Sequence, residues 1–454
     1  MAKLLSFNIM TSQITQKNFV LFVIFILFAT SCKKDPIQPA GPNPLTSDYS
    51  ASIANKWLDL ERDMVWTTKG FTPPVVARAF GYTSLALYES VKGGMPGYKS
   101  LANQLDSHPN LPLLESQSEY YWPASANAAF AESMRGLFMS AVDVKLNRID
   151  SLENALNLDF QKLVNPQVLA KSNSYGKSVG KAIYEWSKTD GGDSGYLSNF
   201  PSSYSPPVGD AMWVQTDANR ALQPFWGNNR PFIKESLTGT TLNPPKAFST
   251  DPSSEFYKQA LEVYNMVNNA TPEQIIIANF WSCDPGTSST PAGHSFSIMT
   301  QVLKNKNANL ALAAEAYARL GVALNDAFIC CWKEKYQYSL IRPVTYINKY
   351  IDQTGNWKTI LVTPPFPEYA SGHSVESSVS ATIMASMFGE NTSFDDHTND
   401  VKGMAPRHFD KFSDFAIEAG ISRMYGGIHY RDGMEEGIKE GKRIGAIYSM
   451  IQLH

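Results

Sequence analysis

The stretch at residues 74–92 reads PVVARAFGYTSLALYESVK and decides the fold class. Proline stands at its first position, which favours a helix start because the first amide of a helix needs no intrahelical partner. Its apolar residues recur three and four apart, the spacing that places them on one face of an α-helix. The stretch therefore predicts a helix with one buried face.

Similar helical patterns recur along the rest of the chain, whereas the alternation typical of strands is scarce. They predict helices near residues 122–140, 143–158, 164–187, 253–268, 271–282, 308–334, 374–388, 409–425 and 434–451. We therefore predict an all-α fold of helical bundles, with two packed four-helix-bundle-like halves and long loops. One large all-α domain with a covering insertion would give the same pattern.

A long Gly/Ser/Pro-rich stretch from about Asp190 to Pro245 separates the helical patterns. Loops of this length in a folded domain usually connect large parts or serve function. We accordingly predict an N-terminal helical region over residues 49–245, which includes this loop insertion, and a C-terminal helical bundle over residues 246–454.

The first 32 residues are predicted to be a lipoprotein signal peptide. Lys17 precedes the apolar run Phe19–Phe28, which is shorter than the roughly 20 residues needed to cross a bilayer, and small residues precede Cys32. This resembles a bacterial lipoprotein cleavage site, after which the cysteine carries the lipid; an ordinary signal peptide is the alternative. We expect residues 33–48 to be a tether that holds an exported, outer-membrane or cell-surface lipoprotein on its periplasmic or extracellular face, with no other membrane attachment.

Composition excludes some classes of function. A net charge of −3 argues against a nucleic-acid binder, which normally carries a basic surplus. The cysteines have no spacing that suits a structural zinc, and adjacent Cys330 and Cys331 are expected to be buried packing rather than a redox pair. His294, His397 and His408 show no ligand-like spacing, and we expect the acidic loop with Asp395, Asp396 and Asp400 to be solvated rather than to bind calcium.

The first segment that can carry chemistry is WKEKYQYSLIRP at residues 332–343. Lys335 and Arg342 are seven residues apart, which on a helix places them on one face two turns apart. Pro343 disfavours helical geometry at Arg342, so we expect the helix to end there. Taken alone, the pair could also be a solvated basic face.

The second segment is PPFPEYASGHS at residues 364–374, a proline-rich loop that runs into a helical pattern. The helix N-terminus, the Ser371 hydroxyl and the close backbone approach that Gly372 permits together suit an anion. His373 could transfer protons to or from that anion. The alternative is that Ser371 only caps the helix and that His373 lies on the surface.

The third segment is GISRMYGGIHYRDG at residues 420–433. A helix from about Asp410 is expected to carry Arg423 near its C-terminal end, and Gly426-Gly427 then turns the chain and presents His429. Taken alone, His429 could be a structural histidine.

The three segments together favour a binding site for a multiply charged anion. Two arginines, a lysine, a Ser-Gly turn and two histidines follow one another between residues 335 and 429. Burying three cations is costly unless an anion sits among them. Arginine forks and a lysine point charge suit the oxygens of a tetrahedral or trigonal-bipyramidal oxyanion, phosphate or vanadate.

This order, Lys-x6-Arg-Pro, Ser-Gly-His and Ser-Arg-x5-His, resembles the signature shared by the vanadium-dependent haloperoxidases and the type 2 phosphatidic acid phosphatases. The resemblance implies an all-α fold and a vanadate cofactor in the C-terminal bundle. It makes His373 the acid/base group and His429 the covalent ligand of vanadium, or the nucleophile of a phosphatase. It assigns the oxyanion's oxygens to Lys335, Arg342, Ser371, Gly372 and Arg423, with Lys335 also assisting catalysis.

Further likeness favours the haloperoxidase branch. Trp332 and Phe366 match aromatic residues that line the halide side of the chloroperoxidase-type pocket. The segment FWSCD at residues 280–284 resembles one whose acidic residue pairs with the vanadate-binding arginine. The resemblance therefore implies that Asp284 is a partner of Arg423.

The chain departs from the family pattern at two places. Ala370 replaces the usual proline before Ser-Gly-His, and Asp432 follows His429 by three residues where the common aspartate follows by four. The imidazole of a metal-binding histidine is normally oriented by a further partner. The sequence shows no obvious partner for His429.

The resemblance implies an enzyme that oxidises halide with hydrogen peroxide to hypohalous acid, with iodide and/or bromide as the expected halides and an organic acceptor, if any, undefined. Vanadate would act as a Lewis acid. One alternative is an acid phosphatase that uses His429 as its nucleophile. Another is a non-catalytic binding lipoprotein of the cell surface, which would have no need for His373.

Overall fold

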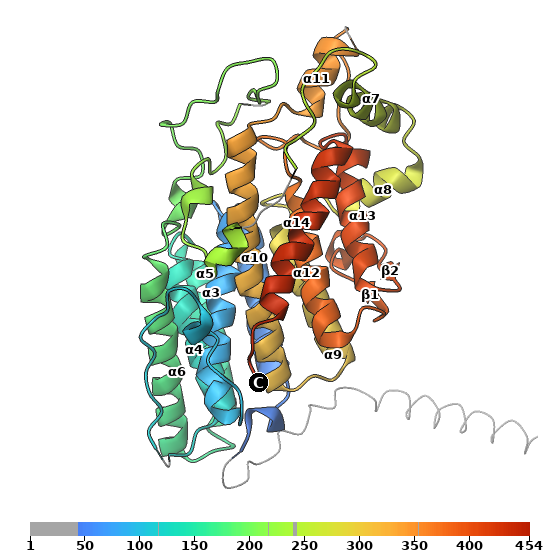
Figure 1. Cartoon of the computed structure of the whole chain (residues 1–454). Helices are drawn as coiled ribbons and strands as arrows, with labels where there is room; N and C mark the ends of the chain where they lie inside the picture. The colour runs from blue at the N-terminus through green and yellow to red at the C-terminus, as the bar shows by residue number, and fades with distance from the viewer. Residues whose placement is uncertain (1–43, 117, 217, 239–242, 353) are drawn as a thin grey trace, which may run out of the picture. The chain divides into compact units, whose positions relative to one another are not determined.

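The computed structural model describes residues 44–116, 118–216, 218–238, 243–352 and 354–454 (Figure 1). The predicted signal peptide, Cys32 and most of the tether lie outside these residues and stay predictions. The described residues form 13 α-helices and one two-stranded sheet, which confirms the all-α fold. Among them, no helix combines the length and the apolar character that crossing a bilayer requires.

The helices before the long loop are α2 (Ser52–Thr67), α3 (Pro73–Val91), α4 (Trp122–Leu137), α5 (Asp143–Phe160) and α6 (Pro166–Ser187). Those after it are α7 (Glu255–Asn268), α8 (Pro272–Phe280), α9 (Thr290–Asn305), α10 (Leu310–Tyr338), α11 (Pro343–Tyr350), α12 (Gly372–Phe388), α13 (Phe412–Tyr425) and α14 (Arg431–Ser449). Strands β1 (Phe394–Asp396) and β2 (Arg407–Phe409) pair antiparallel, with Phe394 opposite Phe409.

Each helix predicted from the sequence is present in the structure, but the sequence patterns did not predict α2, α9 and α11. The face that α2 buries includes the polar Asn55 and Glu61, and the buried face of α9 includes His294 and Thr300. Such residues interrupt the apolar periodicity by which a helix is found. Helix α11 has eight residues and is too short to show a pattern.

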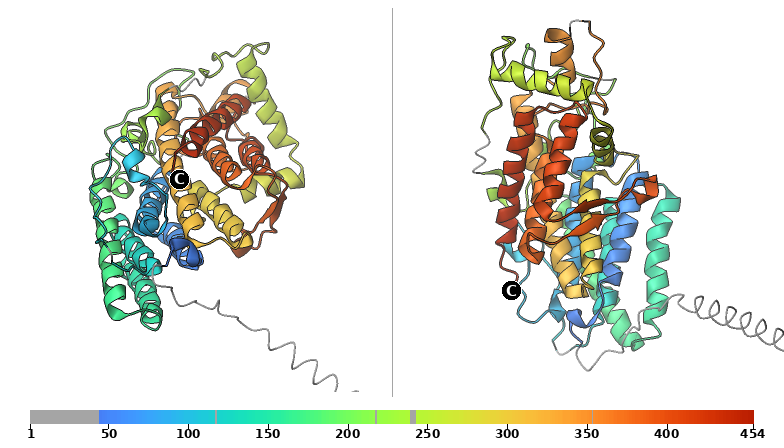
Figure 2. Two further views of the ribbon diagram at one scale, coloured as in Figure 1. Left: turned by 60° about the horizontal axis from the view of Figure 1, so that its bottom comes forward. Right: turned by 90° about the vertical axis from the view of Figure 1, so that its right-hand side faces the viewer.

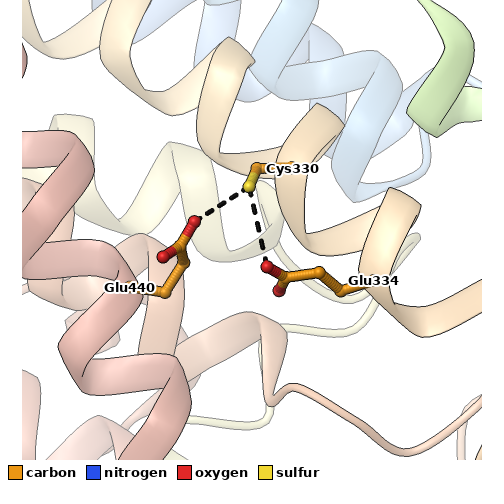
Figure 3. A group of neighbouring side chains, drawn as sticks. All are labelled: Cys330, Glu334 and Glu440. Carbon is orange, nitrogen blue, oxygen red and sulfur yellow. Dashed lines mark hydrogen bonds between the residues drawn. The ribbon is translucent and has the colours of Figure 1, made fainter. Parts of the chain in front are cut away.

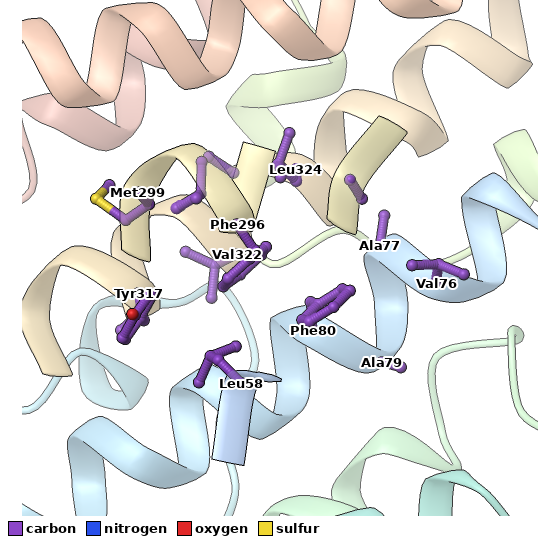
Figure 4. Packing of buried hydrophobic residues seen from close by; sticks show 14 of the residues in the cluster. Leu58, Val76, Ala77, Ala79, Phe80, Phe296, Met299, Tyr317, Val322 and Leu324 are labelled. Atoms are coloured by element: carbon purple, nitrogen blue, oxygen red, sulfur yellow. The ribbon is translucent and has the colours of Figure 1, made fainter. Parts of the chain in front are cut away.

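Helix α10 lies between the two groups of helices and packs against both α3 and α12 (Figures 1 and 2). It approaches α3 closely at Gly321, where an added Cβ would lie 2.8 Å from the carbonyl oxygen of Phe80. The Phe80 ring stacks on Phe296 of α9 at 4.3 Å between centroids (Figure 4). One hydrophobic core extends from Tyr49 to Leu453, and the proposed division near residue 245 stays a prediction.

Helix α14 packs on the start and body of α12 through a row of glycines four residues apart: Gly437, Gly441 and Gly445. A Cβ on Gly441 would lie 2.2 Å from the carbonyl oxygen of Val375, closer than real Cβ atoms approach. Since α12 begins at the Ser-Gly-His segment, this close packing also fixes where that segment lies.

Gly441→Ala is expected to lower the free energy of unfolding by about 1–3 kcal/mol, because the methyl group forces α14 away from α12. Urea denaturation measures this change. The control is Lys442→Ala at the exposed neighbouring position, expected to stay within about 0.5 kcal/mol of wild type. Equal stabilities of the two variants would show that the glycine row is not required.

The long loop predicted near residues 190–245 covers the C-terminal end of α10. The amide of Trp213 donates to the carbonyl of Ser339 at 2.6 Å, and the amide of Leu222 donates to Pro365 at 2.9 Å. The loop thereby connects the N-terminal region to the proline-rich segment.

Candidate active site

The first two chemical groups, Lys335 and Arg342, are brought together by a turn rather than by a shared helix face. Helix α10 ends at Tyr338 because Ser339 adopts a left-handed conformation, with φ 46°. Arg342 is extended, with φ −78° and ψ 152°, and directly precedes α11. The expectation that the helix continues to Arg342 was therefore wrong.

Lys335 is completely buried and holds the proline-rich loop. Its Nζ donates to the carbonyl oxygens of Glu368 at 2.9 Å and Pro367 at 3.3 Å, and also to that of Ala370. Burial, with the nearby charge of Arg342, lowers the pKa of Lys335 to about 8. Its positive charge thus lies directly beneath the segment that leads into Ser371.

Arg342 is also completely buried, and burial lowers its pKa to about 10. Nε donates to the carbonyl of Phe366 and Nη1 to that of Ile428, both at 2.8 Å. Nη1 also lies 3.2 Å from Nε2 of His429, whereas Nη2 has no hydrogen-bond partner.

His429 is oriented by Glu368, a residue that the sequence did not single out. Its Nδ1 lies 2.7 Å from Oε1 of Glu368, which also accepts from the amide of Tyr430 at 3.0 Å. Burial and the charge of Arg342 lower the pKa of His429 well below its usual value, so the ring is neutral. With Nδ1–H donated to the carboxylate, Nε2 carries the lone pair of the ring, and a ligand that binds there replaces its contact with Nη1 of Arg342.

Asp432 does not orient His429. Its carboxylate accepts from the amide of Lys246 at 3.1 Å. The only sequence signal for Glu368 was its place as the one acid in the proline-rich segment.

The Ser-Gly-His segment begins α12, as predicted. Oγ of Ser371 accepts from the amide of Ser374 at 3.4 Å, so Ser371 does cap the helix. His373 is partly buried and lines a cavity rather than the outer surface. Its Nε2 has no partner, and burial and the charge of Arg423 lower its pKa well below its usual value.

Arg423 lies near the C-terminal end of α13, as predicted, and is buried. Its Nη1 donates to the carbonyl of Trp281 at 2.9 Å, while Nε has no partner. Burial lowers the pKa of Arg423, and the charge of Asp284 opposes that shift. The charges of Asp284 and Arg423 interact, but in the described part of the chain these two side chains form no ion pair.

Trp332 and Phe366 form an aromatic wall beside the cations. Their ring centroids lie 5.1 Å apart. The Phe366 ring also lies 4.9 Å from the guanidinium carbon of Arg342 and 5.2 Å from Nζ of Lys335.

Several of these groups line one end of a cavity of about 1620 Å³, whereas Lys335, Arg342 and Ser371 are fully buried and do not line it. Its walls include Trp332, Phe366, Gly372, His373, Arg423 and His429. Other walls come from the N-terminal region, among them Phe71, Tyr196 and Phe200.

The residues present fit an oxyanion. Three buried cations lie around His429, and two N–H groups, Nη2 of Arg342 and Nε of Arg423, have no partner. A buried donor without a partner costs stability, and so does a buried cation that lacks full compensation. A multiply charged oxyanion would supply both the acceptors and the charge, while Nε2 of His429 offers it a lone pair.

Two other sequence expectations were tested by the fold. Cys330 and Cys331 are buried free thiols, as expected of packing residues rather than a redox pair. Asp396, expected in a solvated loop, is instead fully buried, because its Oδ2 lies 2.6 Å from Nε2 of His294 in α9. No motif or spacing in the sequence indicates that these distant residues meet.

A family model described as the VCPO second helical-bundle domain matches residues 315–453. The structure of the first bacterial vanadium-dependent iodoperoxidase is 34% identical, covers 93% of this chain and 99% of its own, and superposes with a TM-score of 0.81. No curated protein sequence matches the chain.

Bacterial vanadium-dependent chloroperoxidases share the fold at lower identity. The holo form is 14% identical, covers 85% of this chain and 93% of its own, and has a TM-score of 0.64. The apo form is 14% identical, covers 86% of this chain and 97% of its own, and has a TM-score of 0.60.

Proposed function

The chain belongs to the vanadium-dependent haloperoxidase family, and we propose that iodide, followed by bromide, is the halide it oxidises. Membership makes it an enzyme of the peroxidase kind that uses vanadate, hydrogen peroxide and a halide. Support for iodide comes from the likeness to an iodoperoxidase along 93% of the chain, and from the chemistry of iodide, the most easily oxidised of these halides.

The single observation that carries the proposed site is a group of three buried cations that act on His429, two of which, Arg342 and Arg423, have a nitrogen donor without a partner. Vanadate, when bound, supplies a Lewis acid that activates hydrogen peroxide without changing its own oxidation state. We assign the bond to vanadium to Nε2 of His429. We assign the hydrogen bonds to the oxygens of vanadate to Arg342, Arg423, Ser371 and the amide of Gly372. Lys335 adds its positive charge.

Lys335 has a role that the sequence did not predict. Its three carbonyl contacts fix the backbone that ends at Ser371. Its charge acts on the same anion at short range, where burial makes electrostatic effects stronger than in water. Lys335 thus combines positioning of the loop with stabilisation of negative charge.

His373 is assigned to proton transfer. Because its pKa is well below the usual value, the ring is neutral at neutral pH and Nε2 can accept a proton from hydrogen peroxide that enters the cavity. The Trp332 and Phe366 rings cover the neighbouring wall and keep water from much of that surface.

His373→Ala is expected to lower kcat for iodide oxidation by about 10²- to 10⁴-fold, the usual contribution of a general acid/base group. Vanadate affinity should change by less than about tenfold, because His429 and the cations remain. Steady-state kinetics and equilibrium dialysis measure the two quantities. The control is His397→Ala, which changes an exposed histidine paired with Asp400. Unchanged turnover in the His373 variant would remove its assigned role.

The halide proposal is tested by assaying vanadate-reconstituted protein with chloride, bromide and iodide separately. We expect kcat/KM to fall in the order iodide, bromide, chloride. Chloride or bromide oxidation that matches or exceeds iodide oxidation would contradict the proposal while leaving the vanadate site intact.

A further inference from the structure

A second cluster of reactive side chains opens onto the cavity of the active site. Sγ of Cys283 lies 3.2 Å from Nδ1 of His294, and Nε2 of the same ring lies 2.6 Å from Oδ2 of Asp396. The three residues are 3%, 2% and 0% exposed. Cys283 lines the same cavity as His373 and Arg423.

Neighbouring residues hold this cluster in place. The His294 ring stacks on Trp281, with centroids 4.5 Å apart and planes at 15°. Oδ1 of Asp396 accepts from the amide of Thr398 at 2.9 Å. The imidazole therefore has one orientation, with one nitrogen on the thiol and the other on the carboxylate.

The charge of His294 favours a reactive sulfur. Burial alone would lower the pKa of His294, but Asp396 and Cys283 outweigh it and raise the pKa to about 10. The ring is thus an imidazolium at neutral pH. Its Nδ1 lies in hydrogen-bond contact with Sγ of Cys283, so a proton donor stands beside the sulfur and can protonate the oxygen that leaves when the sulfur is oxidised.

Cys330 lies beside two carboxylates instead of an imidazolium (Figure 3). Its Sγ lies 2.9 Å from Oε1 of Glu440 and 3.8 Å from Oε1 of Glu334. Burial and these carboxylates raise the pKa of Cys330 well above its usual value. Burial likewise raises the pKa of Cys331 to about 12. Among the described residues, Cys283 lines the cavity, whereas Cys330 and Cys331 do not.

We propose that Cys283, His294 and Asp396 form a second reactive centre of this cavity, at which hydrogen peroxide oxidises Cys283 to a sulfenic acid. The Cys283 thiol gives its proton to water in the cavity as its sulfur attacks one peroxide oxygen and the O–O bond breaks. The other oxygen leaves as hydroxide and becomes water with the proton from Nδ1 of His294. Sulfur loses two electrons, peroxide gains them, and vanadate and halide take no part.

The test uses vanadate-free, pre-reduced protein exposed to hydrogen peroxide and dimedone, a reagent that traps sulfenic acids. Mass spectrometry then follows labelling of each cysteine. We expect Cys283 to be labelled at least about tenfold faster than Cys330 and Cys331, which serve as controls within the same molecule. Labelling of Cys283 at the rate of the other two would overturn the proposal.

Asp396→Asn tests the role of the cluster itself, because it keeps the shape of the side chain but removes its charge. It should slow Cys283 labelling by about tenfold or more, while labelling of Cys330 stays unchanged. An unchanged Cys283 rate would contradict a role for Asp396. If this variant fails to fold, as judged by thermal melting, the comparison of the three cysteines in wild type still decides the proposal.

This centre is distinguishable from halide oxidation. Cys283→Ser is expected to bind vanadate and oxidise iodide at rates within about twofold of wild type, but to lose the dimedone label at this position. Loss of iodide oxidation in that variant would show that Cys283 belongs to the haloperoxidase site and would contradict a separate centre.

Discussion

His429→Ala is expected to lose stoichiometric vanadate binding and to lower iodide oxidation by at least about 10³-fold. The neutral ring is the group that offers a lone pair among the buried cations, since Nδ1–H is held by Glu368. Alanine leaves Arg342, Arg423 and Lys335 in place, so weak anion binding remains while the bond to vanadium is lost. Bound vanadium per chain and kcat/KM for iodide measure the effect.

The activity of His429→Ala is expected to be partly rescued by added imidazole. Removal of the ring leaves space beside Arg342, and added imidazole should restore part of the activity by supplying the missing nitrogen. His408→Ala, at an exposed histidine paired with Asp395, is the control and should behave as wild type. Full vanadate-dependent activity in His429→Ala would contradict the assignment.

Glu368→Gln is expected to weaken vanadate binding by about 10- to 100-fold, the range typical of partners that orient a metal-binding histidine. The carboxylate accepts Nδ1–H of His429 and the amide of Tyr430 through one oxygen. Glutamine keeps the shape but removes the negative charge, and its NH₂ group can face Nδ1 and favour the wrong tautomer. The dissociation constant for vanadate should therefore rise by a larger factor than the factor by which kcat falls when vanadate is saturating.

The matched control for Glu368 is Asp432→Asn, at the acid that the sequence pattern places near His429. Its carboxylate contacts Lys246 rather than the imidazole, so vanadate affinity should stay within about twofold of wild type. A larger effect at Asp432 than at Glu368 would show that the ring is oriented differently from the structure.

The local parts of the site were predictable from sequence because short-range rules determine them. Ser371 could be recognised as a helix cap, and Arg423 as a residue near the end of its helix, from the chain immediately around them. The Lys335–Arg342 spacing identified the right residues but the wrong geometry. No glycine marks the left-handed turn at Ser339 that ends α10.

The contacts that sequence could not supply join distant segments. Glu368 meets His429 across 61 positions, and Asp396 meets His294 across 102. Both contacts depend on how loops and helices pack, which local periodicity does not encode. A buried polar helix face, as in α9, further hides such residues from a search for apolar stripes.

The most direct test of the site is a crystal structure of the vanadate-loaded protein. We expect vanadium bonded to Nε2 of His429, with Arg342 and Arg423 donating to its oxygens and Glu368 still on Nδ1. Vanadate bound elsewhere in the cavity, or held by these cations without a bond to His429, would contradict the account.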